Sequence, residues 1–145
     1  MPTTTLPPLN EENAPAGTPL NTYETSWSRE IIEQYLARTG ESLAAYTLDG
    51  RLRVPPVILL GCYARLIHET FFYETGVHTS SDLTLRRLPF EGETVRVSGA
   101  IGEYFEKNGN IYVRFSVVIR SLDGEPLAEV GHVSIYKFRP KHDRA

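Results

Sequence analysis

The stretch Pro55-Pro-Val-Ile-Leu-Leu-Gly-Cys-Tyr-Ala-Arg-Leu-Ile-His-Glu-Thr-Phe-Phe72 decides the fold. Proline is tolerated in the first turn of a helix, so a helix can begin at Pro55-Pro56. The first half of the stretch is apolar on nearly every side, which is typical of a helix that is buried on most sides. The sequence therefore predicts one central buried helix here.

The residues after this helix change to an alternation of apolar and polar side chains, the period of a β-strand. The alternating stretches are 83–85, 95–101, 111–119 and 133–135. Lys107-Asn-Gly-Asn110 and Asp123-Gly124 are hairpin turn sequences. One apolar helix followed by a long antiparallel meander predicts an α+β hotdog fold, in which the sheet wraps around the helix. A second copy can pair with a sheet edge, so we expect a dimer.

The N-terminal third predicts less regular structure. Residues 1–16 are rich in Thr, Pro, Asn and Glu, and we expect a flexible or surface-draped tail. A short strand over 20–25 and a helix over Ser28–Thr39 should follow, with Ser28 as the N-cap and Gly40 just past the end. The expected organisation is a tail (1–16), a single domain (17–139) and a charged C-terminal tail (140–145).

Composition excludes several classes of function. The 145-residue chain has a net charge of −3 and one cysteine, Cys62. This charge gives no reason to expect nucleic acid or an anionic membrane as a partner, and a single cysteine excludes an intramolecular disulfide. Without a signal-peptide pattern at the start or a long apolar run, we expect a cytoplasmic protein. The histidine spacing matches no zinc signature, and we expect neither a metal nor a cofactor.

Several stretches resemble one family. Trp27-Ser-Arg-Glu-Ile-Ile-Glu-Gln-Tyr-Leu-Ala-Arg-Thr-Gly-Glu41 resembles the opening helix of MaoC-like acyl-thioester hydratases and dehydratases, and Val54-Pro-Pro-Val-Ile-Leu-Leu resembles the start of their central helix. Leu85-Arg-Arg-Leu-Pro-Phe-Glu-Gly-Glu-Thr-Val-Arg-Val and the closing strands from Gly102 to Phe138 follow in the same order. The resemblance covers most of the chain after the tail, and it implies an acyl thioester of coenzyme A or a carrier protein as the ligand.

The resemblance also implies positions for catalysis. In the family an Asp and a His act together on a water molecule, and a backbone N–H at the start of the central helix holds the thioester oxygen. Here Glu41 stands at the Asp position and Tyr46 at the His position. A tyrosine has an ordinary pKa near 10 and is a poor proton shuttle at neutral pH. Pro55-Pro56 replaces the family's Pro-Gly, and proline has no N–H to donate.

Three hypotheses therefore stay open. The chain is a hydratase or dehydratase with Glu41 as an atypical base, or a non-catalytic hotdog subunit that binds thioester or pairs with an active partner, or a thioesterase. The candidate base of the thioesterase is Glu69 on the central helix or, alternatively, Glu41. Val57, Gly61 and His78 are the candidate substrate-binding residues.

The remaining candidates have plainer interpretations. Gly61 more simply allows the helix to approach the sheet closely, and Cys62 is expected in the core. His132 is on the strand face opposite Val133 and, like His78, could line a cavity. Arg86 and Arg87 alternate sides of a strand, so one of them should face solvent. A basic residue here could meet a phosphate of the ligand, although a solvated strand is the better explanation.

Overall fold

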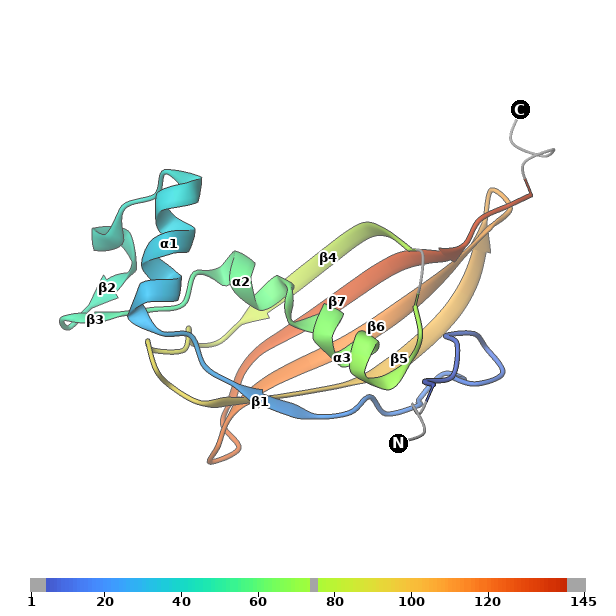
Figure 1. The fold of residues 1–145 in the computed structure, drawn as a ribbon, viewed down its shortest axis with the longest axis horizontal. Helices are drawn as coiled ribbons and strands as arrows, with labels where there is room; N and C mark the ends of the chain where they lie inside the picture. Colours follow the sequence, from blue (N-terminus) through green and yellow to red (C-terminus); the bar gives the residue numbers. More distant parts are fainter. Residues whose placement is uncertain (1–4, 74–75, 141–145) are drawn as a thin grey trace.

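The computed structural model describes residues 5–73 and 76–140, which form a curved antiparallel sheet with helices on one face (Figure 1). The sheet has five strands in the order β1-β5-β6-β7-β4. Their bounds are Tyr23–Thr25 (β1), Val77–Leu85 (β4), Val95–Lys107 (β5), Asn110–Ser121 (β6) and Pro126–Lys137 (β7). Three long strands thus lie in the middle, and the edges are the short β1 and the strand β4.

The alternating sequence of β6 explains which face of the sheet is buried. Val113, Phe115, Val117 and Ile119 are buried, whereas Arg114 and Ser116 between them are exposed. Burial of the apolar face against the helices supplies most of the driving force for this layer arrangement. The expected α+β architecture, a long antiparallel sheet around a helix, is confirmed.

Two turns close the meander as expected. β5 and β6 are joined by Asn108 and Gly109, both with positive φ (53° and 80°), as a tight hairpin turn requires. Gly124, with φ of 89°, turns the chain between β6 and β7. The right-handed twist of the strands favours turn residues with positive φ, and Gly and Asn adopt this conformation most readily. The turns could therefore be predicted from the sequence.

The central helix differs from its prediction in two respects. It is divided at Gly61 into α2 (Pro56–Leu60) and α3 (Cys62–Thr70), because the Gly61 N–H bonds back to the carbonyl of Ile58 and tightens the turn. It is also buried on one side only: Val57 is 57% exposed. The single sheet covers one face, with α3 on β5 and β6 and α2 on β4 and β7, and leaves the other open. No described helix is long and apolar enough to cross a membrane.

A small lobe stands at one end of the sheet (Figure 1). It contains α1 (Arg29–Thr39), the 3₁₀ turn η1 (Leu43–Tyr46), and the strand pair β2 (Thr47–Leu48) and β3 (Arg51–Leu52). The Ser28 hydroxyl accepts from the Ile31 N–H at 3.2 Å, and Gly40 ends the helix with φ of 72°. The predicted helix and both of its end residues are confirmed.

Part of the predicted N-terminal tail packs into the domain. The Leu9 N–H donates to the Phe72 carbonyl, and the Phe72 N–H donates to the Pro7 carbonyl. The Tyr104 hydroxyl donates to the Ala14 carbonyl at 2.6 Å. Leu9 is 7% exposed and Ala14 is fully buried, so residues 7–14 pack against the rest of the domain in this structure. The predicted C-terminal tail lies almost wholly outside the described residues.

Candidate functional site

The two residues at the family's catalytic positions meet in the lobe. Glu41 follows the end of α1, and Tyr46 is the last residue of η1. The Tyr46 hydroxyl donates a hydrogen bond to Oε2 of Glu41, which raises the pKa of Tyr46. Glu41 is exposed and Tyr46 is half-buried. The structure thus brings the pair together, but at the surface and engaged with each other.

The start of the central helix is poor in free donors. Pro56 occupies the first helical position, and no side chain caps the helix at Pro55. The Ile58 N–H donates to the Pro55 carbonyl at 3.1 Å. Two of the first helical residues therefore offer no N–H to an incoming oxygen: Pro56 has none and that of Ile58 is occupied. Val57, between them, lines neither of the cavities beside the helices.

Glu69 is held in a surface ion pair. Its Oε1 lies 2.7 Å from Nε of Arg65, four residues earlier on α3, and both side chains are about half-exposed. The Arg65 guanidinium also lies over the ring of Tyr23. The cavity beneath α3 is lined by other residues of that helix.

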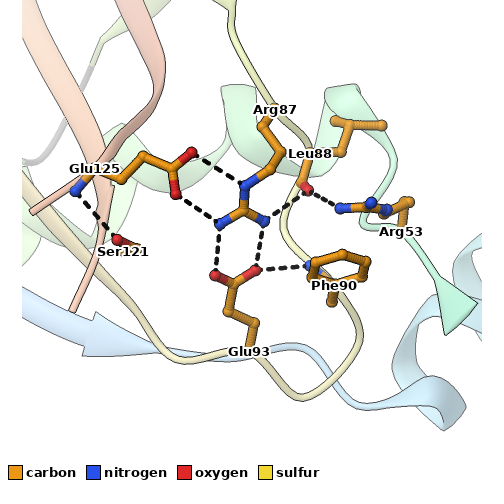
Figure 2. A network of polar contacts seen from close by, with 7 residues as sticks. All are labelled: Arg53, Arg87, Leu88, Phe90, Glu93, Ser121 and Glu125. Atoms are coloured by element: carbon orange, nitrogen blue, oxygen red, sulfur yellow. Dashed lines mark hydrogen bonds and ion pairs between the residues drawn. The ribbon is translucent and has the colours of Figure 1, made fainter. Parts of the chain in front are cut away.

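Arg87 is engaged in a structural network (Figure 2). Its two terminal nitrogens form two 2.8 Å hydrogen bonds to the Glu93 carboxylate, and it also bonds to Glu125. Glu93 accepts in addition from the Phe90 N–H at 3.0 Å, and its pKa is lowered chiefly by Arg87. These two carboxylates neutralise the charge of the guanidinium and occupy its donors, so Arg87 is poorly placed to bind a ligand phosphate. Arg87 joins the end of β4 to the turn before β7.

A cavity of about 210 Å³ lies beneath α3, against β4 and β7. It is lined by Tyr63, Ala64, Ile67, His68, Tyr73, Gly76, His78 and Ser134. His78, predicted as a substrate-binding residue, is among them. Gly61 lines a second hollow of about 220 Å³ with Tyr23, Trp27 and Arg65.

A chain of four polar side chains lies beside the cavity beneath α3, and its two end residues, His78 and Ser134, line the cavity. Nε2 of His78 is 3.0 Å from Oγ of Ser81, and this Oγ is 3.0 Å from Nδ1 of His132. Nε2 of His132 is 2.7 Å from Oγ of Ser134. His78 is exposed, His132 is fully buried, and Ser134 lines the cavity. The chain therefore connects the protein surface to the cavity.

The environment of His132 keeps its imidazole neutral. Burial, and then the nearby His78, lower the pKa of His132 to about 4. The ring of Tyr63 stacks on it with 3.5 Å between centroids. A neutral imidazole donates through one nitrogen and accepts through the other, which suits a position between two hydroxyls.

Sequence reasoning singled out His78 and His132 separately but missed Ser81 and Ser134. The connection depends on the pairing of β4 with β7, which sets Ser81 opposite His132. Partners 51 residues apart leave no local signal. The alternation of His132 and Ser134 on one strand face was the single indication. Among the described residues, no group of three or more His, Cys, Asp or Glu could hold a metal ion.

Solved structures of other proteins share this architecture. A MaoC-like dehydratase from Rhodospirillum rubrum superposes with a TM-score of 0.67 at 13% identity, over 91% of this chain and 99% of that one. A hot-dog-like protein from Thermanaerovibrio acidaminovorans gives 0.62 at 16% identity, over 86% and 84%. The chain has the hotdog fold. The truncated HadBC complex of Mycobacterium tuberculosis, a 3R-hydroxyacyl-ACP dehydratase, also matches, with a TM-score of 0.70 at 16% identity over 83% and 96%.

These similarities confirm, at the level of the fold, the likeness to MaoC-like hotdog proteins that the sequence motifs predicted. No family model and no curated protein matches the sequence. The chemistry of this hotdog domain therefore has to be argued from its own side chains.

Proposed function

We propose that this chain is a hotdog subunit that binds acyl thioesters of coenzyme A or of a carrier protein and lacks the hydration chemistry of the Asp/His dyad. One observation carries the proposal: the side chains at the dyad positions, Glu41 and Tyr46, hydrogen-bond to each other at the surface. Hydration needs a base that takes a proton from water and an acid that delivers one to carbon. Tyr46, with its raised pKa, keeps its proton at neutral pH.

The cavity beneath α3 supports the binding part of the proposal. It is a concave site between the helix and the sheet with an aliphatic wall from Ala64 and Ile67 and several polar groups around it. Binding sites for small molecules commonly combine such a wall with a few convergent polar groups.

The proposed partner is a second hotdog subunit. β4 is an edge strand of the sheet, and its end residues Val77 and Leu85 are large exposed apolar side chains. An unpaired edge of this kind is a template for pairing with another chain. The matching HadBC structure is itself a complex. A partner with an intact Asp and His would supply the dyad, and the cytoplasmic location expected from the sequence suits this proposal.

A second candidate function is hydration by an atypical dyad. It is favoured by one observation: Glu41 and Tyr46, five residues apart, do stand within hydrogen-bonding distance of each other. In this case Glu41 is the base and its proton donor is Tyr46.

The two candidates are separated by one pair of measurements on the purified chain. Calorimetric titration with butyryl-CoA and with free coenzyme A measures binding, and loss of the enoyl absorbance of crotonyl-CoA measures hydration. We expect binding of the thioester without hydration. Hydration that Glu41→Gln abolishes would establish the atypical dyad instead. A chain that binds neither compound, alone or with a hotdog partner, would contradict the proposed function.

A further inference from the structure

The four-residue chain along the cavity has the arrangement of a nucleophile with its base. We propose that Ser134 is an acyl-accepting nucleophile, which hydrolyses short acyl thioesters in the cavity beneath α3 with His132 as its base and Ser81 and His78 as a proton relay. The thioester as substrate class rests on the proposed function. The nucleophile, the base and the relay rest on the geometry of β4 and β7.

The distances fit this assignment. Activated nucleophiles have their base at 2.6–3.2 Å, and a third group holds that base in place. Here Oγ of Ser134 is 2.7 Å from Nε2 of His132. Nδ1 of His132 is 3.0 Å from Oγ of Ser81, which fixes the ring from the other side. Tyr63, stacked on the imidazole, restricts its rotation.

A buried imidazole is costly to protonate, and the relay avoids this cost because the positive charge forms on another residue. Among the described residues the His132 ring has no carboxylate partner, since both of its nitrogens face serine hydroxyls. Ser81, however, also contacts Nε2 of His78, and the His78 side chain is exposed. When His132 takes a proton from Ser134, a second proton can therefore move through Ser81 to His78, where water stabilises the positive charge.

The cavity supplies the remaining requirements. Tyr63 and Tyr73 line it together with Ser134, and a tyrosine hydroxyl is one of the donors that stabilise an oxyanion. Burial raises the pKa of Tyr73, so its hydroxyl keeps its proton. That hydroxyl donates to the Ile135 carbonyl over a long 3.5 Å contact, and it would turn from this carbonyl to the oxyanion. A volume of about 210 Å³ holds roughly seven water-sized groups, at about 30 Å³ each. This space suits a short acyl group.

The reaction balances without a co-reactant other than water. Oγ of Ser134 attacks the thioester carbonyl while its proton passes to Nε2 of His132, the Nδ1 proton to Ser81, and the Ser81 proton to His78. The C–S bond breaks, and the thiolate takes the Nε2 proton of His132 to become the free thiol. The extra proton on His78 returns to Ser81 and the Ser81 proton returns to Nδ1, which restores the relay. Water then attacks the acyl-serine, its proton enters the same relay, and the C–Oγ bond breaks as Ser134 recovers its proton. The products are a carboxylic acid and a thiol.

The rate should be low, because a serine replaces the carboxylate that usually orients the base. Loss of that carboxylate costs roughly 10⁴-fold in a serine hydrolase. The sharpest readout is therefore the acyl-enzyme itself. The full-length chain is incubated with butyryl-CoA or p-nitrophenyl butyrate, quenched in acid, and analysed by intact and peptide mass spectrometry. We expect one butyryl group on Ser134 and slow release of thiol or nitrophenol.

Variants give the matched comparison. Ser134→Ala should lose both the adduct and the hydrolysis, whereas Ser116→Ala, an exposed serine on the outer face of the neighbouring β6, should keep both. His78→Gln, at the exposed end of the relay, should slow acylation by roughly 10²-fold. Should Ser134→Ala fail to fold, labelling of the unmodified chain by phenylmethylsulfonyl fluoride still identifies the reactive serine.

Several results would overturn the inference. These are the absence of any adduct on the unmodified chain, an adduct on another residue, or hydrolysis that Glu69→Gln abolishes and Ser134→Ala leaves intact. Binding of butyryl-CoA without acylation would remove this inference and leave the proposed function standing. Acylation by p-nitrophenyl butyrate without any thioester binding would do the reverse, since it would confirm the nucleophile and exclude the thioester.

Discussion

His132 shows how one residue's environment, rather than its type, sets its chemistry. The side chain is fully buried, with its nitrogens satisfied by Ser81 and Ser134. In the unfolded chain the same imidazole is exposed to water and has an ordinary pKa near 6.5. Folding therefore requires the neutral form over a range of pH in which the unfolded chain prefers the charged form.

This difference predicts an acid-sensitive stability. Between pH 6.5 and about 4 the unfolded chain binds a proton at His132 that the folded chain does not, so the free energy of unfolding falls as the pH falls through this window. The full loss from this group is about 3 kcal/mol, because the pKa falls from 6.5 to about 4 and each tenfold change in proton affinity is worth about 1.4 kcal/mol. Urea unfolding at several pH values should show a shallower pH dependence for His132→Gln.

Glu93 supplies the control for this measurement. Its pKa is lowered by Arg87, so its contribution is present above the ordinary value of 4.5 and is lost as the pH falls below it. Glu93→Gln should change the acid limb below pH 4.5 and preserve the slope between pH 6.5 and 4.5. An unchanged slope there in His132→Gln would show that another group causes the acid sensitivity.

At the scale of elements, the close approach of α3 to the sheet depends on a glycine other than the expected one. A Cβ added at Gly99 on β5 would stand 2.6 Å from the Ser116 carbonyl oxygen and 3.0 Å from Cδ1 of Leu66 on α3. A Cβ at Gly61 would meet only the Ile58 carbonyl, at 3.5 Å. The interpretation of Gly61 as the point of close approach is therefore wrong, and Gly99 has that role.

The two glycines predict opposite effects of the same substitution. Gly99→Ala should destabilise the protein by about 1–3 kcal/mol, because the backbone of β6 must move to admit the methyl group. Gly61→Ala should leave stability unchanged or raise it by up to about 1 kcal/mol, since the residue has helical dihedrals and the added methyl group would make only an ordinary contact. Chemical denaturation of both variants tests this, and equal losses would contradict the assignment.

At the scale of the whole molecule, local signals predicted the elements but not their long-range contacts. The turn at Asn108 and the helix cap at Ser28 follow from preferences within a few residues, and both were predictable. The pairing of Ser81 with His132, and the packing of Leu9 beside Phe72, join residues more than 50 positions apart. Such contacts depend on strand order and chain path, which a single sequence does not encode locally. The fold was thus predictable, whereas the cavity and its polar chain were not.

The packed N-terminal segment predicts that the beginning of the chain contributes to stability. Leu9 is 7% exposed and belongs to the same core cluster as residues of the sheet. Leu9→Ala should lower the free energy of unfolding by about 2 kcal/mol, the lower end for a buried leucine. Leu122→Ala, at a half-exposed position, is the matched control and should change it by less than about 0.5 kcal/mol. Equal effects would show that the segment does not pack in solution.

Exposed apolar side chains on α2 and β4 predict that two hotdog subunits associate. The open side of α2 exposes Val57, and the edge strand β4 exposes Val77 and Leu85. Covering such apolar groups and an unpaired strand edge favours a complex over the single chain. Native mass spectrometry of the purified chain should show a dimer, and the double substitution Val77→Lys and Leu85→Lys should shift it to monomer. Because both side chains are exposed, the monomeric variant should keep its fold, whereas Leu122→Lys should remain dimeric. If the unmodified chain is a monomer, self-association is contradicted and the edge strand is free to pair with a different hotdog subunit. Co-purification of the chain with that subunit would then show the pairing.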